Sequence, residues 1–360
     1  MIDFADLNYR EVKDIFSNRL SLDKKKSSMR ANQVWQFYYK KGYSNPNLFS
    51  NLTQGLRNEL EKIINFSRPK IKNKQVSKDG TIKWLLELND KNLVETVYIP
   101  SKTHATLCIS SQVGCTLNCK FCHTGVQPLV KNLSANEIIN QILIAKDELN
   151  DWKEQKKINN IVYMGMGEPF YNFENIKKSV EILKDENGLN FSNKKITVST
   201  SGISPNIKRA ADELGTYLAL SLHASNDEIR NTIMPINKKY NIQNVINNCN
   251  EYAKKNGEKI FIEYVLLKDV NDSEKCAKEL SKIMSRFPSK LNLIQFNPWP
   301  GVKYLPSTEE QTTKFIEVIK SNGHIATLRK SRGDDILGAC GQLKTASERE
   351  KKLTLSERIR

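Results

Sequence analysis

The chain contains no long uninterrupted run of apolar residues in its 360 positions. No stretch approaches the ~18 consecutive apolar residues that a membrane-spanning helix requires. The first residues, MIDFADLNYREVKDIF, mix acidic with apolar side chains, which is not the pattern of a signal peptide. Tandem repeats of fixed period and long low-complexity tracts are also lacking. We therefore expect a globular, cytoplasmic protein that makes no use of a membrane.

The sequence also lacks the cysteine pattern of a protein held together by disulfides. The seven cysteines, at positions 108, 115, 119, 122, 249, 276 and 340, are odd in number and cluster in one region. Stable disulfides belong mainly to exported proteins, whereas clustered cysteines in a reducing compartment more often bind metal or take part in chemistry. Isolated cysteines are usually small buried apolar residues. We assign no function to Cys249 or Cys276.

Acidic side chains are outnumbered, with 40 Asp and Glu against 56 Lys and Arg, so the formal net charge is +16. Such an excess attracts polyanions over long range, and nucleic acid is the natural partner. A surface rich in lysine is also often merely solvated. Charge alone leaves both interpretations open.

The spacing of apolar residues changes along the chain. Residues 1–66 show helical spacing and predict a small accessory domain. Residues 67–100 begin with the basic segment SRPKIKNKQVSK, expected to be a solvated linker, and continue as a β-hairpin. Residues 101–345 are expected to form the core domain, and residues 346–360 a basic tail.

The core alternates short strand patterns with helical ones. The strand candidates are NIVYMG, KITVST, YLALSLH, KIFIEYVLL, LNLIQF and HIATLR, and the helical stretches are 134–149, 173–186, 241–255, 273–285 and 308–321. This alternation predicts an α/β fold of parallel βα units, curled into a full or partial barrel. Reactive groups of such folds gather at the carboxyl ends of the strands.

Polar residues stand at the predicted ends of these strands. Gly167 and Glu168 lie in a turn where flexible backbone and a carboxylate suit the amino group of a cofactor. Further candidates for contacts to the carboxylate, ribose and adenine of the same ligand follow the next strands. They are Ser199, the run Ser221, Leu222 and His223, and Asn297. Helix capping is the competing role for each polar residue taken singly.

Cys115, Cys119 and Cys122 lie in the segment GCTLNCKFCHTG, so one loop can bind three irons of a cubane through thiolates. The fourth iron has no local cysteine and keeps an open position for a substrate. This C-x3-C-x2-C spacing resembles the signature of the radical S-adenosylmethionine (SAM) superfamily. Zinc held by the three cysteines and His123 is the alternative. It is disfavoured because His123 directly follows Cys122 and zinc ligands usually come as two separated pairs.

Two more cysteines flank the cluster motif. Cys108 lies seven residues before it, and Cys340 lies between two small residues near the far end of the chain. The basic run Arg329-Lys330-Ser331-Arg332 precedes Cys340 and favours an exposed thiolate at that position. Two spare cysteines at opposite ends of a barrel domain can meet in its mouth.

Many segments in the same order give a closer resemblance. The motifs are ETVYIP, ATLCISSQVGC, MGMGEP, STSGI, SLHASND, MPINKKY, FNPWPG and SRGDDI with ACGQL, over about residues 94–343. Together with the cysteine motif they resemble the RlmN family, the dual-specificity ribosomal and transfer RNA methyltransferases of the radical SAM superfamily. Two departures, QPLVKNL and ILGACGQL, touch no proposed ligand or nucleophile, although we expect Pro128 to alter the path of the loop after the cluster.

The resemblance implies a partial (βα)6 radical SAM barrel with a helical, RNA-binding N-terminal domain. It implies one [4Fe–4S] cluster per chain and two molecules of SAM per turnover. The expected substrates are an adenine in the peptidyl-transferase centre of 23S rRNA and the adenine 3′ of the anticodon in a subset of tRNAs, both methylated at C2. An electron donor of the flavodoxin or ferredoxin type is implied as a partner, and nothing requires more than a monomer.

The resemblance also assigns catalytic roles. Cys340 accepts a methyl group from the first SAM and, after a 5′-deoxyadenosyl radical removes a hydrogen from that methyl, its carbon adds to C2. Glu95 takes the C2 proton, and Cys108 releases Cys340 by forming a transient disulfide with it. A radical route suits C2 of adenine because this electron-poor carbon cannot attack the methyl group of SAM as a nucleophile. The nearest alternative is a Cfr-type enzyme acting at C8, and a non-catalytic zinc-dependent RNA-binding protein is the alternative of another class.

Overall fold

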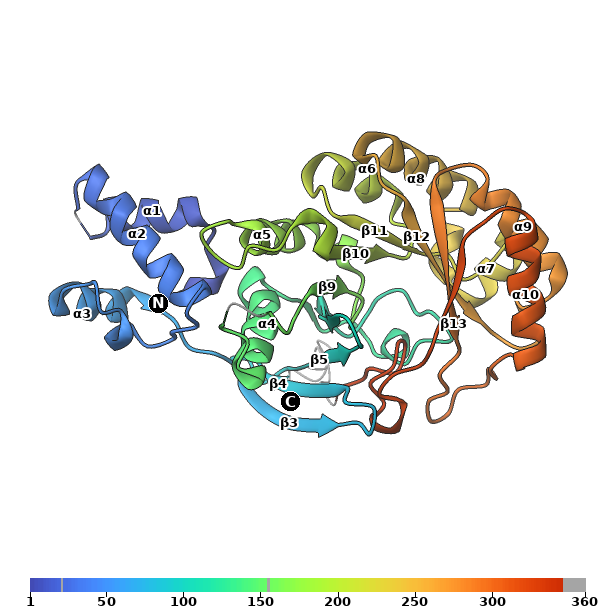
Figure 1. Cartoon of the computed structure of the whole chain (residues 1–360), viewed down its shortest axis with the longest axis horizontal. Helices are drawn as coiled ribbons and strands as arrows, with labels where there is room; N and C mark the ends of the chain where they lie inside the picture. The colour runs from blue at the N-terminus through green and yellow to red at the C-terminus, as the bar shows by residue number, and fades with distance from the viewer. Residues whose placement is uncertain (21, 154–155, 346–360) are drawn as a thin grey trace, which may run out of the picture.

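The computed structural model describes residues 1–20, 22–153 and 156–345 (Figure 1). The expected basic tail, 346–360, lies outside the described residues. A small helical domain lies beside a larger α/β domain in which helices cover a curved sheet. No helix of the described part is long and apolar enough to cross a membrane.

The N-terminal domain contains the helices expected for residues 1–66. Helix α1 (Tyr9–Asn18) begins at Asn8, whose side chain accepts the backbone N–H of Glu11, while the Glu11 carboxylate accepts that of Asn8. Helices α2 (Lys24–Tyr39) and α3 (Gln54–Ile63) follow, and β1 (Ile2–Asp3) pairs in parallel with β2 (Ile64–Asn65). The domain core is aromatic and includes the buried residues Phe4, Trp35, Tyr38, Tyr39 and Phe66. Its role in RNA binding stays a prediction.

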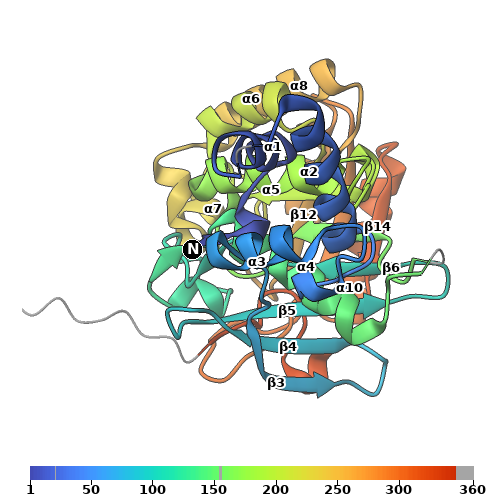
Figure 2. The ribbon, with the colours of Figure 1, turned by 90° about the vertical axis from the view of Figure 1, so that its left-hand side faces the viewer.

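Ten strands of the described chain form one sheet, in the order β14-β13-β12-β11-β10-β9-β6-β5-β4-β3. Seven of them are parallel, namely β6 (Ala105–Cys108), β9 (Asn160–Tyr163), β10 (Ile196–Thr200), β11 (Tyr217–Ser221), β12 (Ile260–Leu266), β13 (Ser289–Gln295) and β14 (Ala326–Arg329). Three antiparallel strands extend the sheet beyond β6, namely β3 (Lys70–Val76), β4 (Ile82–Glu87) and β5 (Leu93–Pro100). Figure 2 shows this extension below the helices.

A helix lies between each of the first six parallel strands and the next parallel strand. The helices are α4 (Ala135–Leu149), α5 (Phe173–Lys184), α6 (Ser204–Glu213), α7 (Asp227–Ile233) with α8 (Ile242–Asn256), α9 (Glu274–Met284) and α10 (Glu309–Ser321). The end strands β14 and β3 do not pair, so the barrel is open. The predicted partial (βα)6 barrel is therefore confirmed.

One face of the parallel sheet is apolar and packs against the helices. Residues that lie opposite one another on this face, such as Leu107 with Ile161 and Val198 with Tyr163, are buried. The Tyr163 hydroxyl lies 2.7 Å from the Ser179 hydroxyl of α5, which fixes this face as the one toward the helices. The opposite face is left to line the barrel interior.

The segment that we expected to be a linker contains strand β3. Lys70–Val76 pairs antiparallel with β4 and forms an edge of the sheet, with most of its side chains exposed. Its sequence shows little hydrophobic alternation because it borders solvent, and exposed lysines are typical of strands that must not pair with another chain. The boundaries predicted for the separate domains stay predictions.

Candidate active site

The antiparallel extension places candidate residues on the interior face of the sheet. Val97 of β5 lies opposite Cys108 of β6 on one side and opposite Lys83 of β4 on the other. Residues that lie opposite each other share a face, and so do residues two apart on one strand. Glu95, two residues before Val97, therefore shares this face with Cys108 and Lys83.

The same face continues across the parallel strands. Following the register from β6 to β13, it carries Cys108, Val162, Thr197 with Ser199, Ala219 with Ser221, Glu263 and Asn292. Several of these side chains are polar, in contrast to the apolar face beneath the helices. Cys108 ends β6 and Ser221 ends β11, at the carboxyl ends where we expected reactive groups, and their roles stay predictions.

The three clustered cysteines lie in the loop between the short strands β7 (Gln112–Val113) and β8 (Lys131–Asn132). Gly125 lets this loop turn back on itself, because a Cβ there would lie 2.7 Å from the carbonyl oxygen of Cys119. The Cys122 N–H donates to the same carbonyl at 3.2 Å. The loop thus brings its thiols toward one place.

The cysteine thiols are close enough to affect one another. Burial raises the pKa of Cys115 to about 12 and raises that of Cys119 and Cys122 as well. The charges of Cys122 and Cys115 raise the pKa of Cys119 further. Three buried thiols in mutual range, on one loop, are a donor set that fits the irons of a [4Fe–4S] cluster, whose positive charge would favour the thiolates.

The geometry does not favour zinc. His123 stacks on Trp299 with ring centroids 4.6 Å apart, and its Nδ1 lies 3.2 Å from the carbonyl oxygen of Gln342. The His123 ring is therefore held by Trp299 and by the carbonyl of Gln342.

Glu168 is buried close to the cysteine loop. Its two carboxylate oxygens accept the backbone N–H groups of Phe170 at 3.1 Å and Ser201 at 2.8 Å. Burial raises the pKa of Glu168, and these hydrogen bonds oppose the rise. Its charge also raises the pKa of Cys115 and Cys119, which places it beside the loop.

Gly167 fixes the turn before this carboxylate. Its φ is +95°, and a Cβ there would lie 2.4 Å from the side chain of Gln112. Gln112 in turn accepts the N–H of Glu168 at 2.8 Å. A side chain at position 167 would therefore displace Glu168.

The other residues expected to contact the cofactor lie at or near the ends of successive strands, where they make hydrogen bonds within the protein. The Ser199 hydroxyl donates to the carbonyl of Tyr163 at 2.6 Å and caps no helix. Ser221 ends β11, and the buried Leu222 donates its N–H to the Glu263 carbonyl at 3.1 Å. Their contacts with a cofactor stay predictions.

His223 is a neutral, fixed side chain. Burial lowers its pKa to about 3. Its Nδ1 accepts the Val265 N–H at 3.0 Å, which leaves the hydrogen on Nε2, and its ring meets Phe121 of the cysteine loop edge-on at 4.8 Å. The Asn297 amide donates to the carbonyl of Cys340 at 3.4 Å.

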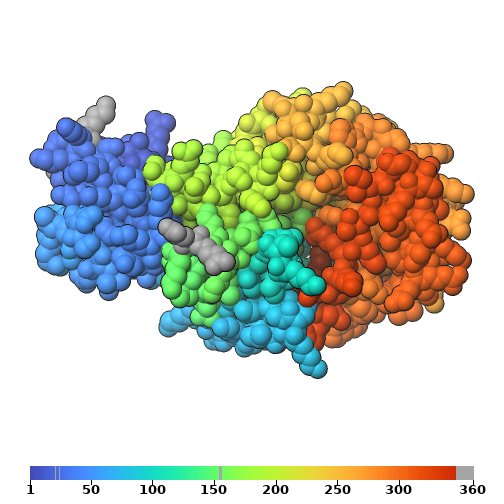
Figure 3. Space-filling view, viewed as in Figure 1, coloured from blue at the N-terminus to red at the C-terminus, as the bar shows by residue number. Residues whose placement is uncertain are grey.

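The residues that follow Cys340 are held against the cysteine loop by hydrogen bonds. The His123 N–H donates to the Gly341 carbonyl at 2.7 Å, and the Thr124 hydroxyl donates to the Leu343 carbonyl at 2.6 Å. Figure 3 shows the C-terminal part, in orange and red, meeting the cyan surface near residue 100, with a hollow at the junction. Cys340 as a residue is exposed, although protein atoms surround its thiol.

Cys108 and Cys340 are electrostatic neighbours. Burial raises the pKa of each thiol to about 12, and the charge of Cys340 raises that of Cys108 further. Arg329 lowers the pKa of both thiols while it also pairs with Glu263 at 3.4 Å, and Arg332 pairs with Asp79 at 3.8 Å. The thiolate expected at Cys340 stays a prediction.

Sequence reasoning missed two buried cations. Lys83 lies 3.0 Å from the Glu95 carboxylate, with both side chains almost fully buried. Arg230 donates to the carbonyls of Ser201 and Leu222, just beyond the ends of β10 and β11. The position of Lys83 within the otherwise apolar run IKWLL was the only sign in the sequence that this lysine is buried. Nothing in the sequence indicated that Arg230, on helix α7, is buried.

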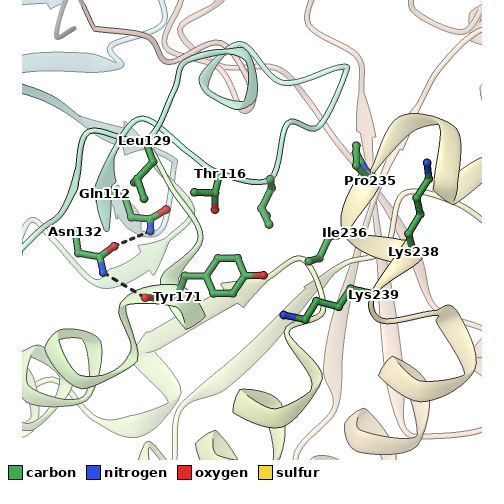
Figure 4. Close-up of a pocket in the computed structure, with 10 residues that line it drawn as sticks. Gln112, Thr116, Leu129, Asn132, Tyr171, Pro235, Ile236, Lys238 and Lys239 are labelled. Atoms are coloured by element: carbon green, nitrogen blue, oxygen red, sulfur yellow. Dashed lines mark hydrogen bonds between the residues drawn. The ribbon is translucent and has the colours of Figure 1, made fainter. Parts of the chain in front are cut away.

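A cavity of about 880 Å³ opens beside the cysteine loop (Figure 4). Tyr171 lines it, and burial together with the charges of Tyr240, Glu168 and Cys115 raises the pKa of its hydroxyl. Lys238 and Lys239 line the opposite wall, across from Gln112 and Asn132. The volume is that of a site for a nucleotide-sized ligand.

Comparison with known proteins agrees with these features. The Radical SAM superfamily matches residues 109–279. A dual-specificity RNA methyltransferase RlmN of Chelativorans sp. (strain BNC1) is 47% identical over 351 residues, which cover 92% of this chain and 86% of that protein. The protein of the same name from Rhizobium meliloti (strain 1021) is 48% identical over 343 residues, covering 90% and 84%. A crystal structure of a radical SAM methyltransferase from Sphaerobacter thermophilus has a TM-score of 0.89 at 35% identity, covering 95% of this chain and 99% of that one.

Proposed function

This chain belongs to the RlmN family of radical SAM methyltransferases, and on that premise we propose that it methylates C2 of adenine in both 23S rRNA and tRNA. The observation that carries the proposal is the meeting of Glu95, Cys108 and Cys340 beside the cysteine loop. Glu95 and Cys108 lie on the consecutive strands β5 and β6, whereas Cys340 comes from the far end of the sequence. The dual-specificity name of the relatives does not favour a Cfr-type enzyme acting at C8.

Cys115, Cys119 and Cys122 would hold the [4Fe–4S] cluster. When bound, the cluster supplies the electron that cleaves SAM and so generates a 5′-deoxyadenosyl radical. We assign the amino group of SAM to Glu168, because this carboxylate is buried beside the loop and its oxygens retain further acceptor capacity. Gly167, Ser199, Ser221, Leu222, His223 and Asn297 complete the proposed contacts.

Cys340 acts first, as the methyl acceptor. Its sulfur forms a bond to the methyl carbon of SAM while the bond from that carbon to the sulfonium breaks, and S-adenosylhomocysteine leaves. Because the pKa of this thiol is raised, it must lose its proton as the substrate arrives. The positive charge of the sulfonium favours that loss.

Glu95 and Cys108 act after the methyl carbon of Cys340, which has lost a hydrogen atom to the 5′-deoxyadenosyl radical, has bonded to C2 of the base. The radical adduct would first give up one electron, back to the oxidised cluster. Glu95 then takes the proton from C2, leaving the electron pair on the ring. The Cys108 thiolate then attacks the sulfur of Cys340, the sulfur–carbon bond breaks, and the released carbon takes a proton to become the methyl group. The two cysteines are left as a disulfide, which an external dithiol must reduce.

The wider setting of the enzyme follows from its charge and site. We infer that the net charge of +16 draws RNA to the protein, where an unpaired adenine leaves its stack to enter the interior site. A small electron-transfer protein of the flavodoxin or ferredoxin type would feed the cluster. We place the enzyme in the cytoplasm and expect it to act as a monomer.

Anaerobic reconstitution followed by reaction with RNA tests the proposal. The expected result is about four irons and four sulfides per chain, and 2-methyladenosine in fragments of both 23S rRNA and tRNA. Bound zinc without iron would contradict the cofactor assignment. Formation of 8-methyladenosine alone would contradict the assignment of C2.

A further inference from the structure

Lys83 and Glu95 form a buried ion pair on the interior face of the sheet. The Lys83 Nζ lies 3.0 Å from Glu95 Oε1, and the two side chains are only 9% and 6% exposed. They are diagonal neighbours on strands β4 and β5, since Lys83 lies opposite Val97. The Ser110 hydroxyl also donates to the Glu95 carbonyl at 2.7 Å, which fixes the backbone of this residue.

The same ion pair holds both sides of the loop that carries Cys340. Lys83 Nζ donates to the carbonyl of Leu337 at 3.2 Å, three residues before Cys340. The N–H of Lys344, four residues after Cys340, donates to Glu95 Oε2 at 2.9 Å. The loop from 337 to 344 is therefore fastened at both ends to one lysine–glutamate pair.

We propose that Lys83 is a positioning residue, which keeps Glu95 ionised and aimed at the base joined to Cys340. This inference rests on the proposed function and adds a residue to it. Lys83 touches no reacting atom. It acts through Glu95, whose carboxylate must be free of a proton when it accepts the one from C2.

The electrostatics of the site support this role. Burial raises the pKa of Glu95, and the charge and hydrogen bond of Lys83 are the largest influences that lower it again. The N–H of Lys344 acts in the same direction. Cys108 from β6 and Cys340 from the C-terminal loop face the same interior. An opposite charge at this range typically lowers a carboxyl pKa by about 1–3 units, so loss of Lys83 should shift the pKa of Glu95 upward.

The test compares Lys83→Met with Lys83→Arg and wild type in the reconstituted holoenzyme. In Lys83→Met we expect Cys340 to be methylated normally, by intact mass, and a covalent protein–RNA adduct to accumulate at pH 7. The rate of adduct resolution against pH should have its midpoint shifted upward by about one unit or more. Lys83→Arg should restore most of the wild-type rate. A wild-type adduct level and midpoint in Lys83→Met, or a loss of Cys340 methylation in a folded protein, would overturn the proposal.

Two further measurements keep the test decisive. Lys194→Met is the matched control, because Lys194 is exposed and pairs with Glu258 at 2.7 Å near the amino ends of the parallel strands. If Lys83→Met does not fold, Glu95→Gln is compared with Glu95→Gln/Lys83→Met, whose buried pair is neutral. Equal adduct levels in these two proteins support the proposal, and a lower level in the double variant refutes it.

A readout without RNA separates this inference from the proposed function. The infrared carboxyl band that is present in wild type and lost in Glu95→Gln reports the ionisation of Glu95. We expect the pH at which this band changes from protonated acid to carboxylate to be higher in Lys83→Met than in wild type. If wild type forms no 2-methyladenosine, the proposed function is wrong. If the transition lies at the same pH in both proteins, the role of Lys83 is wrong.

Discussion

Arg230 gives the sharpest prediction about what holds the cofactor site together. Its side chain is fully buried on α7, and burial lowers its pKa to about 10, so it remains a cation at neutral pH. It donates to the Ser201 carbonyl at 2.6 Å, the Leu222 carbonyl at 3.0 Å and the Asn237 side chain at 2.8 Å. One guanidinium therefore joins the ends of β10 and β11, where cofactor candidates stand.

Replacing Arg230 with Met should destabilise the protein substantially. The change removes five hydrogen bonds of the guanidinium, three of them at 3.0 Å or shorter, and each of these three contributes about 1–3 kcal/mol. Relief of the buried charge offsets part of this loss. We expect the free energy of unfolding to fall by about 3–6 kcal/mol. Arg230→Lys keeps the positive charge but loses the planar guanidinium that bonds several acceptors at once. The free energy of unfolding should therefore fall by about half as much as in Arg230→Met.

Urea unfolding measures this effect, with Arg209→Met as the control. Arg209 is also paired with carboxylates, Glu174 and Glu213, but is 41% exposed on α6, so its loss should cost under about 1 kcal/mol. Affinity for SAM, measured by calorimetry on the reconstituted protein, should weaken at least tenfold in Arg230→Met. An unfolding free energy within about 1 kcal/mol of wild type would refute the reasoning.

Three further predictions concern the site and its supports. Cys108→Ala should trap a covalent protein–RNA adduct on denaturing gels, because no thiol remains to release the methylated base; full turnover would exclude the resolving role. Gly167→Ala should weaken SAM binding by tenfold or more, since the new Cβ meets Gln112, whereas Gly257→Ala, also at positive φ but in open space, should bind SAM normally. Equal binding by both would contradict the tight approach at Gly167. Hydrogen bonds from Thr81 and Gly333 outweigh burial and lower the pKa of Asp79 to about 2, so its contribution to stability is present above pH 4 and lost as pH falls through about 2. The difference in unfolding free energy between wild type and Asp79→Asn should shrink over that range, and a constant difference would be contrary to this reasoning.

The sequence predicted the parallel core because strand and helix periods alternate clearly there. It did not predict β3, because an edge strand facing solvent has little apolar alternation and depends on its partner β4 for pairing. The sequence could not show which partners the basic residues before Cys340 meet in the fold. Arg329 pairs with Glu263 and Arg332 with Asp79, and Arg329 also lowers the pKa of Cys340.

The chemistry of the site was only partly visible in the sequence. Motifs identified Glu95, Cys108 and Cys340, but their meeting depends on the register of β4, β5 and β6 and on the return of the C-terminal loop. Lys83 belongs to none of the motifs. Its partner Glu95 lies on the neighbouring strand, and such a pair is known only once the pairing of the strands is known.

The central claim, that this protein methylates C2 of adenine in RNA, is tested most directly by nucleoside mass spectrometry of RNA from cells with and without the protein. We expect 2-methyladenosine to disappear from both 23S rRNA and tRNA without it. It should return with the wild-type gene but not with Cys340→Ala. Unchanged 2-methyladenosine, or a change confined to 8-methyladenosine, would show that the protein does not methylate C2.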